Sequence, residues 1–161
     1  MDVNGFKGPN SEARNGKQYD IRSFKVARFS KGCAGNEIKG FGCVYQLPSY
    51  WPIKAGSEEM KKWDPNWTKE KVGYYAGNNN YWAGAKKACD DIGMSLPDKS
   101  KLYSLYRAGR EDSSLGLPDY GWFWSSSEVR ASRAYDVGFG GGGMSEDDKD
   151  YSLNKVLCVG D

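Results

Sequence analysis

Hydrophobic residues recur at helical spacing in two segments of the second half of the chain. In residues 80–92 they are three or four positions apart, at Trp82, Ala85, Cys89 and Ile92. These positions share one face of a helix, and Gly93 follows where a C-terminal cap is expected. The pattern predicts an amphipathic helix over 80–92.

A second helix is predicted over residues 99–108. Asp98, directly after Pro97, is a candidate N-cap, and Gly109 is expected to end the helix. The apolar face consists of Leu102, Leu105 and Tyr106. Packing against a hydrophobic core accounts for both helices.

Shorter apolar runs predict strands nearer the two ends of the chain. Residues 23–29 and 41–47 read as two strands, and the glycine-rich connection over 32–42 reads as a hairpin closed at its base by Cys33 and Cys43. Residues 121–126, 134–139 and 155–159 predict three further strands. Gly140 begins a turn of four glycines over 140–143, and residues 144–150 are expected to form an exposed acidic loop.

The remaining segments have no sustained period. Residues 1–20 are polar and rich in turn signals, which predicts a loop or an ordered tail. Residues 48–73 read as a long structured insertion held by the packing of Trp51, Trp63 and Trp67. The whole pattern predicts an α+β fold, loop-rich, with two helices packed on short antiparallel sheets. We expect an N-terminal segment over 1–47 packed on a domain over 48–161, which together form one unit.

Composition restricts the chemistry. The 161 residues include no histidine, which excludes Ser-His-Asp and Cys-His catalysis and histidine-ligated zinc. A net charge of +2 gives no chain-wide attraction to nucleic acid or to an anionic membrane. Glycine, at 21 residues, and aromatic residues, at 14%, are both abundant. We therefore expect no catalytic residue, no cofactor, no metal and no nucleic-acid partner.

The four cysteines allow three disulfide connectivities. We favour Cys33 with Cys43 and Cys89 with Cys158, and buried free thiols remain the alternative. The spacings do not provide the two tight pairs of a tetrathiolate zinc site. No apolar run is long enough for a membrane span, and the N-terminus lacks the features of a signal peptide. The chain is therefore cytosolic or has lost a targeting segment, and disulfides favour an extracellular or cell-surface location.

Residues 81–160 resemble bacterial C-type-lectin-like domains, which include a domain of collagen-like adhesins and relatives of the formylglycine-generating enzyme. The resemblance rests on the helix pattern, on Leu96-Pro97, on Trp124-Ser-Ser-Ser-Glu128, and on the final Val156-Leu157-Cys158-Val159. It implies two helices, a short antiparallel sheet and a disulfide between Cys89 and Cys158. The sequence departs from the family at Met94-Ser95, where Trp-Arg is usual.

Such domains bind sugars or proteins, or carry out oxidase chemistry. The chain lacks the Glu-Pro-Asn, Gln-Pro-Asp and Trp-Asn-Asp motifs of calcium-dependent lectins. The cluster of Glu146, Asp147, Asp148 and Asp150 could hold a hard cation, although a solvated acidic loop is the simpler interpretation. Oxidase activity would require reactive thiols.

Residues 124–159 resemble, more narrowly, the variable proteins of diversity-generating retroelements. A framework of hydrophobic residues alternates with residue types that mutagenesis of asparagine codons at adenines can produce, at Val129, Arg130, Ser132, Arg133, Asp136, Gly138 and Gly140. Met144 and Glu146 cannot arise in this way. An ordinary exposed hairpin is the alternative. Alternate strand residues face opposite sides, so one side could hold the core while the other varies.

Residues 2–45 resemble, at low specificity, the part of a type IV pilin that follows its long N-terminal helix. The resemblance implies that such a helix, and with it any membrane contact, has been removed.

Together these patterns predict an extracellular, non-enzymatic module that binds an unknown protein or glycan and is displayed on a pilus or similar structure. The alternatives are an undiversified pilus or adhesin subunit and an enzyme related to formylglycine-generating oxidases. The candidate binding residues are Trp122, Val129, Arg130, Ser132, Arg133, Tyr135, Asp136, Gly138, Gly140, Asp147, Asp148 and Asp150.

Overall fold

Both predicted helices are present, each with a side-chain N-cap. In the computed structural model, which describes residues 33–73 and 78–160, α3 spans Tyr81–Asp91 and α4 spans Lys99–Glu111. Asn80 and Asp98 each accept a hydrogen bond of 2.8 Å from the backbone N–H three residues on. Gly93 follows α3 with a φ of +78°, as a helix-terminating glycine should. The end predicted at Gly109 is wrong, because α4 continues for two more residues past it.

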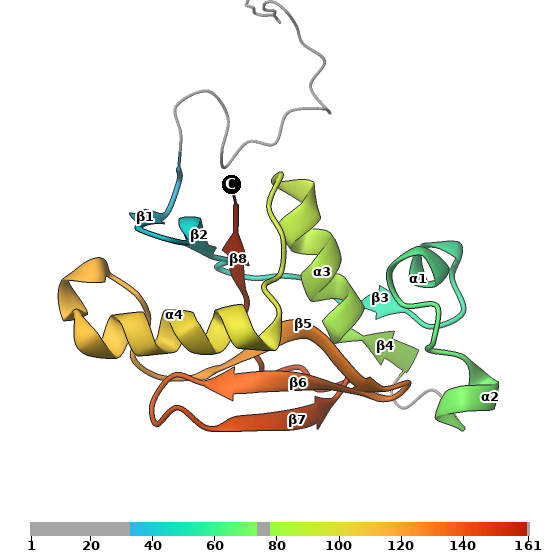
Figure 1. Ribbon diagram of the computed structural model, residues 1–161. Helices are drawn as coiled ribbons and strands as arrows, with labels where there is room; N and C mark the ends of the chain where they lie inside the picture. Colours follow the sequence, from blue (N-terminus) through green and yellow to red (C-terminus); the bar gives the residue numbers. More distant parts are fainter. Residues whose placement is uncertain (1–32, 74–77, 161) are drawn as a thin grey trace, which may run out of the picture.

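The largest sheet is antiparallel and has the order β5-β6-β7. Its strands are β5 (Trp122–Arg130), β6 (Arg133–Gly138) and β7 (Met144–Asp148). Helix α4 lies along one face of this sheet (Figure 1). The predicted strands over 121–126 and 134–139 are confirmed. The loop predicted over 144–150 is wrong for residues 144–148, because β7 pairs with β6 along its whole length.

A second antiparallel sheet joins the two ends of the described chain. It has the order β1-β2-β8, with β1 at Asn36–Ile38, β2 at Gly42–Gln46 and β8 at Leu157–Val159. The second predicted strand, over 41–47, is confirmed as β2, but its hairpin partner is β1, which lies inside the segment expected to be the connection. The strand expected over 23–29 lies outside the described residues. β2 belongs to the predicted N-terminal segment over 1–47, and it pairs with β8, which belongs to the predicted domain over 48–161.

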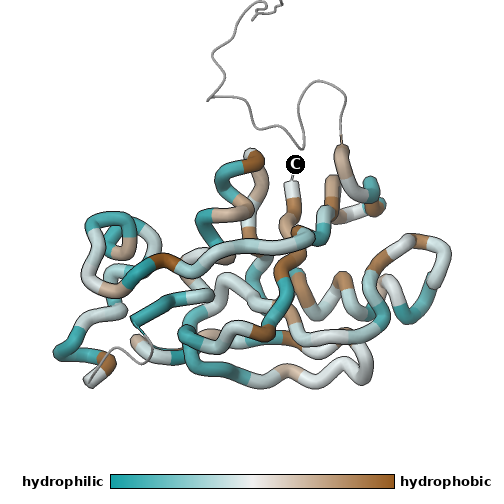
Figure 2. The backbone as a smooth tube through the Cα atoms, turned by 180° about the vertical axis from the view of Figure 1, so that it is seen from behind, coloured by the Kyte–Doolittle hydropathy of each residue, from teal (hydrophilic) through white to brown (hydrophobic). Residues whose placement is uncertain are grey.

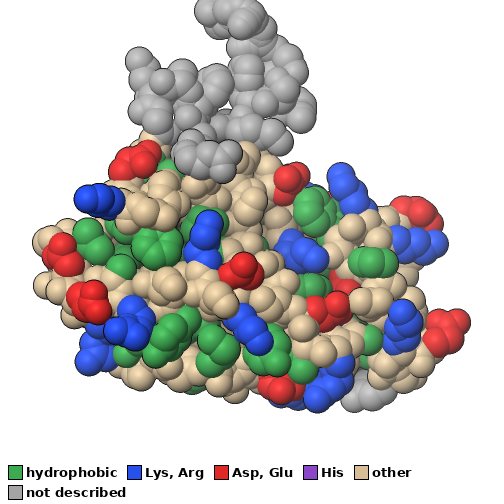
Figure 3. All heavy atoms as spheres, in the orientation of Figure 1, with side chains coloured by type: hydrophobic (Ala, Val, Ile, Leu, Met, Phe, Trp, Pro, Cys, Tyr) green, Lys and Arg blue, Asp and Glu red, His purple; other side chains and the backbone are tan. Residues whose placement is uncertain are grey.

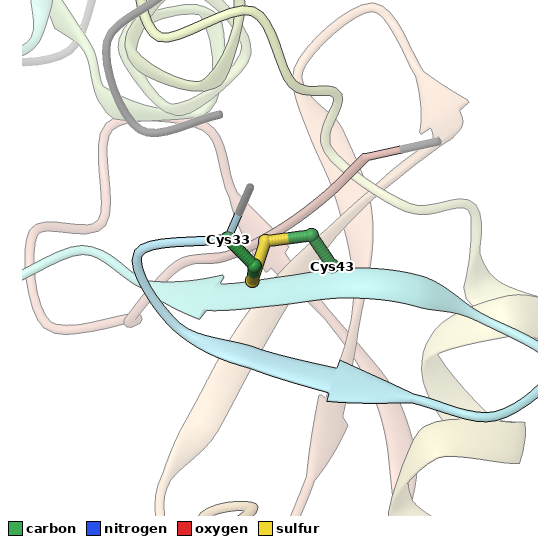
Figure 4. The surroundings of a disulfide bond; sticks show 2 residues. All are labelled: Cys33 and Cys43. Carbon is green, nitrogen blue, oxygen red and sulfur yellow. A yellow bond between two sulfur atoms is a disulfide. The ribbon is translucent and has the colours of Figure 1, made fainter. Parts of the chain in front are cut away.

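Both favoured disulfides are confirmed. Cys33 is bonded to Cys43 across the β1–β2 hairpin, with a Cα–Cα distance of 5.5 Å (Figure 4). Cys89 of α3 is bonded to Cys158 of β8, with a Cα–Cα distance of 5.4 Å. The second bond closes a 69-residue separation and holds α3 against the second sheet. Because all four cysteines are bonded, none is a free thiol.

The segment over 48–73 contains short elements that its sequence did not predict. These are β3 (Ile53–Lys54), α1 (Glu58–Trp63) and α2 (Lys69–Val72), and β3 pairs with β4 (Asn79–Asn80). Ser57 caps α1 and Thr68 caps α2. Trp67 is buried with Ile53, Met60 and Ala83. Trp51 is 80% exposed, so the expected aromatic packing is wrong for that residue.

Neighbouring residues of β5 belong to two different clusters of the hydrophobic core. Phe123 packs with Val137 and with the α4 side chains Leu102 and Leu105, whereas Trp124 packs with Trp82, Ala134 and the Cys89–Cys158 disulfide. Figure 2 shows hydrophobic positions along the segment that leads to the C-terminus and at scattered places elsewhere in the chain. A short 3-10 helix, η4 (Ser113–Leu115), follows α4. Among the described residues, no helix has the length and apolarity needed to cross a membrane.

Candidate binding surface on the β5–β6–β7 sheet

The register of the sheet assigns the candidate residues to two faces. Residues directly opposite each other on paired strands lie on the same face. Trp122 pairs with Gly138, Trp124 with Asp136, Asp136 with Ser145 and Ala134 with Asp147. These residues therefore share the face opposite α4. Val137 and Tyr135 alternate with them and lie on the α4 face.

Four candidates meet at the β5–β6 hairpin end, which comprises Val129, Arg130, Ser132 and Arg133. Arg133 Nε donates to Glu146 Oε1 at 2.7 Å, and its Nη1 donates to Asp148 Oδ1 at 2.8 Å. Arg130 Nη1 lies 3.1 Å from the same Glu146 oxygen. Arg130 is exposed and the other three are half-buried. Exposed ion pairs of this kind contribute little to stability, so the hairpin end tolerates change.

Tyr135 extends this group toward α4. The Lys99 Nζ at the start of α4 lies 3.9 Å from the Tyr135 ring centroid, a cation–π distance. Positive and negative side chains are interspersed over the face shown in Figure 3, in keeping with the small net charge. The hairpin end therefore offers local charges and one aromatic ring.

The opposite face holds a small pocket. It has a volume of about 220 Å³ and is lined by Trp122, Ser145, Asp147, Tyr151 and Asn154. The chain after β7 crosses this face, since Asn154 bonds to β6 and β7 and Lys155 then pairs with Phe123 of β5. The pocket thus brings together two candidates, Trp122 and Asp147, and three residues that the sequence did not indicate.

Asp136 is fully buried in this face, so its expected exposure is wrong. Asn154 Nδ2 donates to Asp136 Oδ2 at 2.9 Å and to Asp147 Oδ2 at 3.2 Å. Burial, together with the neighbouring Asp147 carboxyl within hydrogen-bonding reach, raises the pKa of Asp136 to about 8. The Asp136 carboxyl group is therefore mostly protonated at neutral pH.

Gly138 is also buried, so its expected exposure is wrong as well. A Cβ on Gly138 would lie 3.0 Å from three atoms of the Trp122 indole, which therefore lies against the glycine. Gly142 has a φ of +79°, and a Cβ there would meet the Tyr106 ring at 2.5 Å. The backbone conformation and the Tyr106 ring therefore require glycine at 142, whereas a side chain at 138 would require the Trp122 indole to move. Gly140, by contrast, is exposed in the β6–β7 turn, far along β6 from the hairpin end.

Lys149 is a fully buried charge in the segment that was expected to be an exposed loop. Its Nζ lies 3.0 Å from Asp64 Oδ2 and 2.5 Å from Glu128 Oε2. Asn80 Nδ2 also donates to Asp64 Oδ2, at 2.8 Å. Asp150, the next residue, is half-buried, and burial and then the Asp148 charge raise its pKa. The four acidic residues thus lie in three places. Glu146 and Asp148 bond to the hairpin end, Asp147 lines the pocket, and Asp150 lies in the turn after β7.

No protein-family model matches the chain, and no curated protein matches it.

Proposed function

We propose that this protein is an extracellular, non-enzymatic binding module that uses two parts of the β5–β6–β7 sheet to hold a protein or glycan ligand. The first part is the hairpin end, and the second is the pocket on the opposite face. The disulfides favour an oxidising compartment. Bonding of all four cysteines leaves no thiol for oxidase chemistry, and the chain has no histidine for hydrolytic catalysis.

The distribution of exposed hydrophobic side chains carries this proposal. Among the described residues, six large hydrophobic side chains are exposed, and five of them belong to residues 120–153. The five are Tyr120, Trp122, Met144, Tyr151 and Leu153. Exposed aromatic rings beside small polar residues are typical of binding surfaces, because rings add contact area with little loss of entropy.

The helices, the sheet and the Cys89–Cys158 disulfide are compatible with a C-type-lectin-like fold, which we propose for this chain. In this arrangement Trp124 and Cys158 belong to the fixed core. The proposed pilus display rests on residues 2–45, most of which lie outside the described residues.

We also propose that the hairpin end is diversified, as in the variable proteins of retroelements. Two of the seven candidate diversified positions, Asp136 and Gly138, are buried and have contacts that replacement would disrupt. The five positions that remain replaceable are Val129, Arg130, Ser132 and Arg133 at the hairpin end and Gly140 in the β6–β7 turn.

Sequencing of the gene and its flanking DNA in many isolates tests the diversification. We expect amino-acid differences to concentrate at those five positions, while Trp124, Asp136, Gly138 and Cys158 stay unchanged. We also expect a near-identical template repeat of the last ~40 codons beside a reverse transcriptase gene, the length of the C-terminal framework described above. Variation spread evenly over exposed positions, with no repeat, would show an undiversified module.

A further inference from the structure

Two buried oxygen atoms lie next to the pocket: one belongs to the lining residue Asn154, and the other belongs to Asp136, to which Asn154 donates a hydrogen bond. Asp136 is 0% exposed and Asn154 is 2% exposed. Within the described part of the chain, Asp136 Oδ1 and Asn154 Oδ1 have no hydrogen-bond partner. Leaving a buried acceptor unpaired costs about 1–3 kcal/mol, so two beside one pocket favour a ligand that supplies positive charge or N–H groups.

The carboxyl pair makes the floor acidic. Asn154 Nδ2 bridges Asp136 and Asp147, which uses one oxygen of each carboxyl group and fixes both side chains. The described cations of the sheet have other partners: Arg130 and Arg133 bond to Glu146, and Lys149 bonds to Asp64 and Glu128. Lys155 Nζ lies 4.3 Å from the Tyr120 ring. The charge of the carboxyl pair is therefore left for a ligand.

The walls and size distinguish between kinds of cation. Trp122 and Tyr151 line the pocket and remain 44% and 40% exposed. Aromatic rings attract an organic ammonium group through their faces. A calcium ion needs about six to eight oxygen ligands, more than Asp136, Asp147, Asn154 and Ser145 readily provide. A volume of about 220 Å³ also exceeds that of a bare ion and suits an alkyl chain that ends in a charged group.

We infer that this pocket binds a primary ammonium group at the end of an alkyl chain, such as a lysine side chain presented by a protein ligand. The ammonium group would lie against Asp147 and Asn154, which line the pocket, and its methylene groups would pass between Trp122 and Tyr151. This inference rests on the proposed function, because it names the chemistry that one part of the proposed surface recognises.

Titration with a small lysine analogue tests the inference on the whole chain. Nα-acetyl-lysine methylamide is added to ¹⁵N-labelled protein, and the Trp122 indole and Asn154 side-chain N–H signals are followed by NMR. Nα-acetyl-norleucine methylamide is the control, since it has the same length of alkyl chain without the charge. We expect saturable shifts with the lysine analogue and none with the norleucine analogue.

Three variants and one metal titration make the test decisive. Asp147→Asn keeps the side-chain shape and should weaken binding by about 30-fold or more, because one buried charge of the pair is lost. Asp90→Asn, at an exposed position of α3 outside the pocket lining, is the matched control and should bind as the native protein does. Tyr151→Leu, at the rim, should weaken binding less and serves if Asp147→Asn does not fold.

Equal shifts with both analogues, or binding unaffected by Asp147→Asn, would overturn the inference. Shifts with calcium chloride but not with the lysine analogue would overturn it in favour of a metal site. These results leave the function of the hairpin end intact, since no pocket residue belongs to it. Conversely, the titration remains interpretable if the hairpin end proves not to bind ligands.

Discussion

Replacing Lys149 by Met is expected to lower the free energy of unfolding by about 3–5 kcal/mol at pH 7, the usual loss when one partner of a buried ion pair is removed. Met has a similar length, so the main change is the loss of the ammonium group. Asp64, which is 2% exposed, and Glu128 would then face each other without a cation. Urea unfolding followed by fluorescence measures the change.

A triple variant separates charge from packing. Lys149→Met, Asp64→Asn and Glu128→Gln together should recover much of the stability at pH 7, because neither carboxylate is then left without its lysine partner. A triple variant as unstable as Lys149→Met alone would show that Lys149 acts through packing alone.

Trp124→Ala should cost about 3–5 kcal/mol, the usual range for removing a large buried aromatic residue. Trp124 is fully buried between the sheet and the Cys89–Cys158 disulfide. Its indole N–H also donates to the Tyr50 hydroxyl at 3.1 Å, and that hydroxyl donates to Asn154 O at 2.7 Å. The substitution therefore leaves a cavity and removes a link to the segment that forms the pocket.

Trp51→Ala is the matched control for this experiment. Trp51 is exposed, so its replacement should change the free energy of unfolding by less than about 0.5 kcal/mol. Thermal unfolding monitored by circular dichroism compares the two variants under the same conditions. Similar losses in both would contradict the placement of Trp124 in the core.

Local sequence signals predicted the elements whose stability depends on their own residues. The three-and-four spacing in α3 and α4, the cap at Asp98 and the pairing of cysteines are all visible without a structure. β7 was missed because residues 144–148, three of which are acidic, show no hydrophobic alternation and form a strand only through pairing with β6. Helix α1 was missed because six residues are too few to establish a period.

The candidate surface was predicted in part, for a related physical reason. Residue type predicted that residues 129–133 lie outside the core, and the structure places them where β5 meets β6, so their role in binding stays a prediction. The same reasoning failed at Asp136 and Lys149, whose charges are buried because distant residues meet them: Asn154 for the first, Asp64 and Glu128 for the second. The predicted exposure of Gly138 was wrong for the same reason, because Trp122 contacts this glycine only in the folded chain. Nothing in the local sequence reports such contacts.

Substitutions at the hairpin end are expected to change which ligand the protein binds while the core keeps its structure. A display library randomised at Val129, Arg130, Ser132 and Arg133 tests this claim by selection on immobilised lysozyme and, separately, on serum albumin. A control library randomises four exposed residues of α1, which are Glu58, Glu59, Lys61 and Lys62.

We expect clones specific for each target from the first library and far fewer from the control. Their Tm should stay within about 3 °C of the native protein, roughly the shift that 1 kcal/mol causes in a domain of this size. Equal yields from both libraries, or specific clones whose Tm has fallen by tens of degrees, would contradict the claim.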